Sequence, residues 1–301
     1  RPLGWGGGSL GLFPFANSVV QTKIFRRVIY RIRGGGVMHR FFIDTQGQHA
    51  IVPGEMISLP EKLAHQVRDV LHLAVGEQMV LLDNSGDELV CVIASSGRSA
   101  IEVEVLERRT GKSESPVHII LCQGLLKSAR FEWLLEKGTE LGVATFAPVV
   151  CHRSMAGLKD AGSAKIQRWQ RIIQEATEQC GRARLPELLP IRPLTYVLND
   201  IPPGALAVMP WEEARESSLH DALQTIHPAA SQDMPRAMTI VLFIGPEGGL
   251  APEEVMLAQK HGVQVVTLGQ RILRAETAAL AAVANIMYEL EIRHHRPIVS
   301  L

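Results

Sequence analysis

The sequence VLFIGPEGG at residues 241–249 decides the expected fold, because an apolar, β-branched run breaks there at a glycine and a helical pattern follows at 252–261. The sequence VVTLGQRILRAETA at residues 265–278 repeats this order, with a helical pattern over 276–290. Each stretch therefore predicts a strand, a loop and a helix of an α/β sheet. In such sheets, ligands bind in loops at the carboxyl ends of the strands.

The residue types in these two loops suit a bound ligand. Glycines allow positive φ angles and let a ligand approach the main chain closely, and Pro246 stiffens the first turn. Glu247 is the one charged residue of the first loop, whereas Arg274 and Glu276 stand at a helix start, where free backbone N–H groups can also hold a ligand. Neither loop has the spacing of a phosphate loop or a dinucleotide fingerprint. Ordinary tight turns are the alternative interpretation.

Further apolar runs alternate with helical patterns along the C-terminal region. Strands are expected at 117–122, 145–150, 206–209, 239–244 and 263–268, and helices at 129–141 and 164–180. Ser128 and Ser163 precede the two helices and are predicted to cap them, while Gly142 and Gly181 follow their ends. This alternation predicts a mainly parallel sheet with helices on both faces.

Residues 38–112 are expected to form a small β-rich domain instead. Short strand patterns, separated by Gly, Asn and Ser turns, occur at 39–43, 56–59, 79–82, 89–94 and 101–106. Residues 61–73 have helical spacing, and the whole pattern predicts a small barrel. The polar, turn-rich sequence at 110–116 is the expected linker, so a second domain is placed at 113–301.

The charge of the chain is balanced, with 31 Lys and Arg against 31 Asp and Glu. The first 37 residues contain six basic residues and no acidic one, so the remainder is net acidic. A role with nucleic acid therefore needs local basic patches and cannot be argued from net charge. We expect residues 1–37 to lie outside the fold, as an artefact or a leader. An organelle transit peptide is the alternative, although serine is scarce there.

The hydrophobic content of 46% suffices for ordinary cores, and no apolar run approaches membrane-spanning length. The four cysteines, Cys91, Cys122, Cys151 and Cys180, stand far apart. No close pair of them with a histidine has metal-ligand spacing, which argues against a zinc site. Three of them stand in apolar or helical contexts that are typical of buried free thiols in a reducing compartment.

Five motifs, taken together and in this order, closely resemble the RsmE-type ribosomal RNA methyltransferases of the SPOUT superfamily. They are QGLLK at 123–127, EKGTELG at 136–142, EQCGR at 178–182, IGPEGG at 244–249 and LGQRILRAETA at 268–278. The resemblance covers the chain from about residue 38 to residue 291. It implies an α/β methyltransferase domain with a deep trefoil knot at 113–301, preceded by a PUA-like β-barrel that binds RNA at 38–112. A cytoplasmic homodimer is also implied.

The resemblance implies transfer of a methyl group from S-adenosylmethionine, without a metal, to N3 of one uridine in small-subunit (16S) ribosomal RNA, within the assembled subunit. Because N3 lies on the pairing edge, that uridine has to be unpaired or flipped into a pocket. Two alternatives stay open. One is another SPOUT enzyme, which methylates a ribose 2′-hydroxyl or a different base, for instance on transfer RNA. The other is a non-catalytic RNA-binding assembly factor, against which the glycines and Arg274 argue.

Candidate site residues follow from the loops and the resemblance. The residues that are expected to hold the cofactor are Gly245, Pro246, Glu247, Gly248, Gly249, Leu268, Gly269, Ile272, Leu273 and Ala278. Arg274 is expected to stabilise a uridine anion, and Glu276 or Glu247 to accept the N3 proton. A purely structural pair between Arg274 and Glu276 is the alternative.

Contacts with RNA phosphates require basic side chains, of which arginine can bind a phosphate through two hydrogen bonds. The expected contacts are Arg40, Lys127, Arg130, Lys137, Arg153, Arg182 and Arg184. For Lys137, a local ion pair within its helix is equally open.

Overall fold

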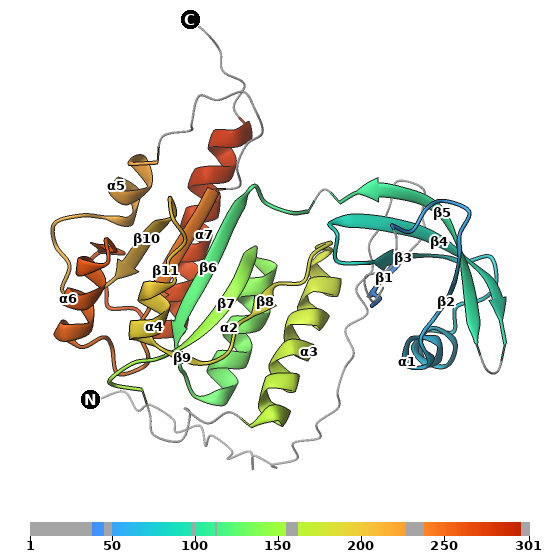
Figure 1. The fold of residues 1–301 in the computed structure, drawn as a ribbon, viewed down its shortest axis with the longest axis horizontal. Helices are drawn as coiled ribbons and strands as arrows, with labels where there is room; N and C mark the ends of the chain where they lie inside the picture. The colour runs from blue at the N-terminus through green and yellow to red at the C-terminus, as the bar shows by residue number, and fades with distance from the viewer. Residues whose placement is uncertain are drawn as a thin grey trace, which may run out of the picture.

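The computed structural model describes residues 38–44, 50–97, 100–111, 113–154, 162–226 and 238–295, and no side chain of 291–295. The expected extension at 1–37 lies outside the described residues. Two β-sheets lie at opposite ends of the molecule, and the chain between β5 (Ile101–Thr110) and β6 (Val117–Gly124) connects them (Figure 1). The predicted boundary between residues 112 and 113 falls in this connection.

The first sheet has five strands in the order β1-β3-β4-β5-β2. The strands that join β5 in it are β1 (His39–Phe42), β2 (Met56–Ser58), β3 (Gln78–Leu82) and β4 (Asp87–Ser96). β1 pairs with β3 in parallel, and the other neighbours are antiparallel. All five predicted strands are therefore confirmed. Among the described residues the pairings end at β1 and β2, so closure into a barrel stays a prediction.

The helix predicted at 61–73 is shorter than expected. α1 (Glu61–His65) continues into the π-helical turn η1 (Gln66–Val70), and the chain leaves the helix where His72 has a φ of 54°. A positive φ is incompatible with a right-handed helix, so the helical spacing of the sequence extends past the true end.

The second sheet is entirely parallel and has the order β12-β10-β11-β6-β7-β8, with β9 also paired to β7. The strands that join β6 in it are β7 (Val143–Val150), β8 (Glu187–Leu188), β9 (Arg192–Pro193), β10 (Leu206–Pro210), β11 (Met238–Ile244) and β12 (Gln264–Val266). The predicted parallel sheet is confirmed. Sequence reasoning missed β8 and β9, because two residues are too few to show a period.

Helices cover both faces of this sheet, as predicted. α2 (Ser128–Glu140), α3 (Ser163–Cys180), α5 (Leu219–Gln224) and α7 (Ala275–His295) pack on one face, and α4 (Leu194–Asn199) and α6 (Pro252–Lys260) pack on the other. Successive strand residues alternate between the two cores, as Val241 and Leu242 do. None of the helices in the described part of the chain is long and apolar enough to cross a membrane.

The predicted helix caps are half right. Gly181 has a φ of 81° at the end of α3 and Gly142 one of 95° just after α2, so both glycines end their helices as predicted. Ser128 and Ser163 are not caps, because each is the first residue of its helix. Ser128 Oγ instead donates a hydrogen bond to Glu132 one turn later.

Three cysteines are buried free thiols: Cys91 in the core of the first sheet, and Cys122 and Cys151 in the core of the second. Burial raises the pKa of the Cys91 and Cys151 thiols to about 12. It also raises the pKa of the Cys122 thiol. A thiol with so high a pKa is not a nucleophile near neutral pH, so the three side chains serve packing.

Candidate active site

Loops that follow four adjacent parallel strands gather at one edge of the second sheet. In the order β12-β10-β11-β6 every neighbouring pair is parallel, so all four carboxyl ends point the same way. The loop at 245–251 follows β11, and the loop at 267–274 follows β12. The two glycine stretches therefore belong to one edge of one sheet.

The loop after β11 lies directly against the end of β6. Gln123 Nε2 donates to the carbonyl of Gly245 at 3.1 Å, although the residues are 122 positions apart. A Cβ atom on Gly124 would lie 2.4 Å from the backbone nitrogen of Pro246, so only glycine fits at position 124. Sequence reasoning quoted Gly124 within a motif but did not assign it to the site. Its signal was a glycine at the end of a buried apolar strand.

The glycines of the first loop also touch neighbouring side chains. A Cβ atom on Gly248 would lie 3.1 Å from Cβ of Arg153, and Arg153 Nη1 donates to the Gly248 carbonyl at 3.3 Å. Gly249 has a φ of 74°, and its Cβ would lie 3.0 Å from a carboxylate oxygen of Glu212. Arg153, a predicted phosphate contact, thus lies against the loop. Glu212, which follows β10, was not predicted.

The second glycine loop leaves its backbone open. Gly269 has a φ of 111°, and nothing lies within 4 Å of the place where its Cβ would be. Thr267 Oγ1 accepts a hydrogen bond from the Gly269 N–H at 3.1 Å, which fixes the turn. Leu268 and Ala278 pack against the core, whereas Ile272 is 86% exposed. The main chain at Gly269 is exposed, and a side chain at this position would occupy the open space beside it.

A single guanidinium joins the two loops. Arg130, in the first turn of α2, donates from Nη1 to Glu247 Oε1 at 2.9 Å, and its Nε lies 3.6 Å from Glu276 Oε1. Glu247 also accepts the backbone N–H of Lys127 at 3.4 Å. Glu276 is 8% exposed, and its Oε2 is buried without a hydrogen-bond partner. The site therefore contains a carboxylate oxygen that is shielded from water and unsatisfied within the protein.

Arg274 does not form the structural pair with Glu276 that was the alternative for it. Its side chain is exposed, and among the described residues no carboxylate lies within ion-pairing distance of it. Its backbone carbonyl accepts the N–H of Ala278 and so starts α7. The guanidinium is free to meet a ligand.

Arg182 has a structural role that contradicts its predicted contact with RNA. It is 7% exposed, and its Nη1 donates to the carbonyls of Thr139 and Val143 at 3.2 and 2.7 Å. Its Nη2 donates to Glu114 at 3.0 Å. Buried cations need such partners, and here they tie the α3 end to the linker after β5. Sequence alone suggested an exposed loop, because Arg182 and Arg184 stand just past the end of a predicted helix.

We expect the replacement of Arg182 by methionine to lower the free energy of unfolding by about 3 kcal/mol, because it removes the buried cation that pairs with Glu114 and donates to the carbonyls of Thr139 and Val143. Arg184→Met is the matched control, since this exposed arginine makes one side-chain bond, to the Ser85 carbonyl, and should cost about 1 kcal/mol. Urea denaturation measures both. If Arg182→Met kept its stability but bound RNA more weakly, Arg182 would be a phosphate contact, as the sequence predicted.

Three other predicted RNA contacts are already paired within the protein. Arg184 and the adjacent Leu185 N–H bond to the turn between β3 and β4, on the first sheet. Arg40 donates to Glu88 at 2.7 Å. Burial alone would raise the pKa of Glu88, but hydrogen bonds from Arg40 and Arg109 hold it below the ordinary value. Hydrogen bonds to Glu136 and Glu140 raise the pKa of Lys137, which confirms its local ion pairs.

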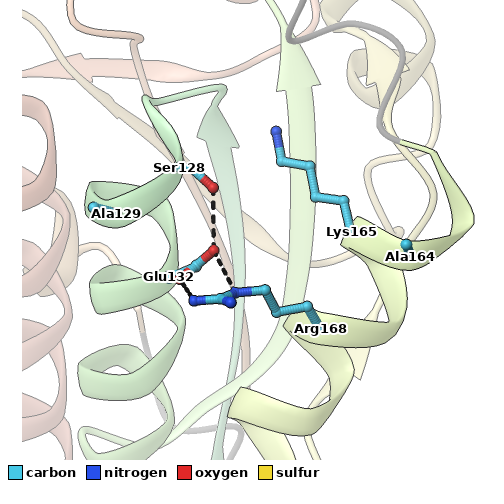
Figure 2. Close-up of a pocket in the computed structure, with 6 residues that line it drawn as sticks. All are labelled: Ser128, Ala129, Glu132, Ala164, Lys165 and Arg168. Carbon is cyan, nitrogen blue, oxygen red and sulfur yellow. Dashed lines mark hydrogen bonds and ion pairs between the residues drawn. The ribbon is translucent and has the colours of Figure 1, made fainter. Parts of the chain in front are cut away.

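A shallow pocket of about 480 Å³ lies between the starts of α2 and α3 (Figure 2). It is lined by Ser128, Ala129, Glu132, Ala164, Lys165 and Arg168. Arg168 forms two hydrogen bonds to Glu132, of 2.8 and 2.7 Å, which lower the pKa of that carboxyl. None of its lining residues comes from the glycine loops. Among the described residues no cluster of His, Cys, Asp and Glu could hold a metal ion.

Similarity to known proteins places the parallel sheet with its two glycine loops in the class of α/β methyltransferases that act on RNA. A family model described as an RNA methyltransferase domain matches residues 113–287. The ribosomal RNA small subunit methyltransferase E of Bacillus subtilis is 30% identical over 257 residues, which are 85% of this chain and 98% of that protein. Its counterpart in Synechocystis is 33% identical over 238 residues, or 78% and 74% of the two chains.

The solved structures agree with the sequence relatives. A ribosomal RNA small subunit methyltransferase E from Neisseria gonorrhoeae, bound to S-adenosylmethionine, has a TM-score of 0.71 and 31% identity, and the match covers 84% of this chain and 98% of that one. A putative methyltransferase from Legionella pneumophila, in complex with the same cofactor, has a TM-score of 0.66 and 28% identity over 84% and 98% of the chains. This chain belongs to the RsmE family of small-subunit ribosomal RNA methyltransferases.

Proposed function

We propose that the protein transfers a methyl group from S-adenosylmethionine to N3 of a uridine in small-subunit ribosomal RNA. One observation carries the proposal. Two glycine loops meet at one sheet edge, beside a buried carboxylate oxygen of Glu276 that has no partner. The names of the relatives, and the cofactor bound to the Neisseria and Legionella proteins, support the substrate and the methyl donor.

The residues of the two loops fit the cofactor. In the first loop, Gly248 is exposed, and Gly245 and Gly249 are partly buried beside close neighbours. In the second loop, the place of a Cβ atom on Gly269 is open space. In our proposal, backbone groups of both loops hold the adenosine, with Leu268, Leu273 and Ala278 behind it. The exposed side chain of Ile272 then covers the bound cofactor on its solvent side.

When bound, S-adenosylmethionine supplies an electrophilic methyl carbon on a sulfonium. The Glu276 carboxylate accepts the N3 proton of the uridine, and the exposed Arg274 stabilises the negative charge that spreads to the uracil oxygens. The bound cofactor would supply the methyl carbon to N3, and the electron pair of its carbon–sulfur bond would remain on the thioether. Holding N3 in line with the methyl carbon contributes much of the acceleration. Glu247 is the second candidate for the acceptor.

RNA binding and assembly complete the proposal. Arg153 and Lys127 lie beside the first loop and are the phosphate contacts that we retain. The first sheet, as a PUA-like barrel in a domain of residues 38–112, binds the surrounding RNA, and the trefoil knot forms within residues 113–301. We also propose a homodimer through α2 and α7, because these packed helices expose the aromatic side chains of Trp133 and Tyr288.

Nucleoside mass spectrometry of small-subunit RNA tests the reaction. RNA from cells that lack the protein should have lost one 3-methyluridine, and the purified protein should restore it with S-adenosylmethionine. Unchanged 3-methyluridine would reject the proposal. Loss of another methyl mark would identify a different RNA methyltransferase activity.

Gly124→Ala should weaken S-adenosylmethionine binding at least about 10-fold and lower the free energy of unfolding by about 2 kcal/mol. The added methyl group would collide with the backbone of Pro246 and push the first loop out of place. Gly162→Ala is the matched control, because nothing lies within 4 Å of its Cβ position. Calorimetric titration measures the affinity. A Gly124→Ala protein with wild-type affinity would show that this contact does not shape the site.

A further inference from the structure

The side chain of Arg130 links the first glycine loop to the start of α7, directly after the second loop. Its Nη1 donates to Glu247 of the first loop at 2.9 Å, and its Nε lies 3.6 Å from Glu276 at the end of the second. The three residues come from α2, the loop after β11 and the start of α7, which are far apart in the sequence. The side chain of Arg130 is 42% exposed, against 21% for Glu247 and 11% for Glu276.

We infer that Arg130 is a positioning residue for methyl transfer, which holds the first glycine loop and the start of α7 at the spacing the cofactor requires and fixes the Glu276 carboxylate between them. The inference rests on the proposed function. Attraction to Arg130 fixes Oε1 of Glu276, while Oε2 is buried without a hydrogen-bond partner, so Arg130 is the described cation that holds this carboxylate in place. Glu247 is held twice, by Arg130 and by the Lys127 N–H.

The charges of the cluster favour this role over a contact with RNA. Two carboxylates flank one guanidinium, so the cluster has a single net negative charge, opposite in sign to a sulfonium and equal in sign to a phosphate. Without the guanidinium, Glu247 and Glu276 would face one another with no cation between them, and the loops would move apart. One Arg130 donor already bonds Glu247, and the Glu276 carboxylate lies 3.6 Å from a second, so part of the guanidinium is turned toward carboxylates.

The geometry also explains why arginine suits this position. A planar guanidinium presents Nη1 and Nε to different partners at the same time, whereas the ammonium of lysine is a single point charge. Lysine at position 130 would keep the charge between the carboxylates, but its single nitrogen would have to lie near both of them at once, whereas Arg130 uses two separate nitrogens. Arg130→Lys should therefore retain part of the function that Arg130→Met loses.

The test uses the full chain with Arg130→Met, Arg130→Lys and the matched control Arg168→Met. Arg168 also pairs with a carboxylate of α2, Glu132, but this pair does not contact the loops. For Arg130→Met we expect the Kd of S-adenosylmethionine to rise about 10-fold or more and the single-turnover rate to fall by at least as much. The KM for RNA should stay unchanged, and the Tm should fall slightly, because the buried Glu276 loses its cation. For Arg130→Lys, the Kd and the rate should lie between those of the wild type and Arg130→Met. For Arg168→Met, both should equal the wild-type values.

A double variant shows whether the cluster acts as a unit. Arg130→Met combined with Glu247→Gln should lose less cofactor affinity than the two single losses together, because both remove the same bridge. A raised KM for RNA with an unchanged Kd would overturn the inference and make Arg130 a phosphate contact, and full additivity would also count against it. If the wild-type protein fails to bind S-adenosylmethionine, the proposed function itself fails; if it binds and Arg130→Met binds equally, only the inference does.

Discussion

Glu276→Gln is expected to slow methylation by about 10²- to 10⁴-fold, because an amide oxygen cannot take up the N3 proton as a carboxylate does. The substitution keeps the size of a side chain that is 8% exposed, so the fold should tolerate it. Its Oε2 has no hydrogen-bond partner in the described structure, so the change removes no bond to that oxygen. The amide also removes the charge that pairs with Arg130 at 3.6 Å, so a small loss of stability should accompany the much larger loss of rate.

Single-turnover kinetics with saturating RNA and cofactor measures this effect. The matched control is Glu253→Gln, which makes the same chemical change at an exposed residue in the first turn of α6. We expect the control to react at the wild-type rate, and Glu276→Gln to bind the cofactor within a few-fold of the wild type. If Glu276→Gln methylates at the wild-type rate, Glu276 is not the proton acceptor, and Glu247 becomes the candidate.

Arg274→Met should slow methylation by about 10²- to 10³-fold, the range seen when a preorganised group for a developing oxyanion is removed. The side chain is exposed and has no carboxylate partner among the described residues, so its loss should change the free energy of unfolding by less than about 0.5 kcal/mol. The affinity for S-adenosylmethionine should also stay the same, because the anion develops on the uracil ring.

The division between kcat and KM decides the role of Arg274. A fall in kcat at constant KM for RNA supports stabilisation of the anion, since that interaction exists only in the transition state. A raised KM at constant kcat would make Arg274 a phosphate contact instead, and would contradict the proposal. Arg171→Met, on the exposed face of α3, is the control and should change neither constant.

Local patterns sufficed for most of the fold. The five strands expected before residue 112 and the five expected after it all form, and the glycines at 142 and 181 end their helices as predicted. These features follow from the alternation of apolar residues and from the conformational freedom of glycine, which act over a few neighbours. The predicted caps at Ser128 and Ser163 failed because a serine can stand one residue inside a helix as well as before it.

The sequence by itself determined the two glycine loops, the residue types in them and the parallel sheet that carries them. Only the tertiary structure decided which charged groups meet. Strand order placed Gln123 against Gly245, set Arg130 between Glu247 and Glu276, left Arg274 unpaired by any described carboxylate, and buried Arg182. A single chain reveals the charge of a side chain but not its partner, because ion pairs form between residues that the fold brings together from distant positions.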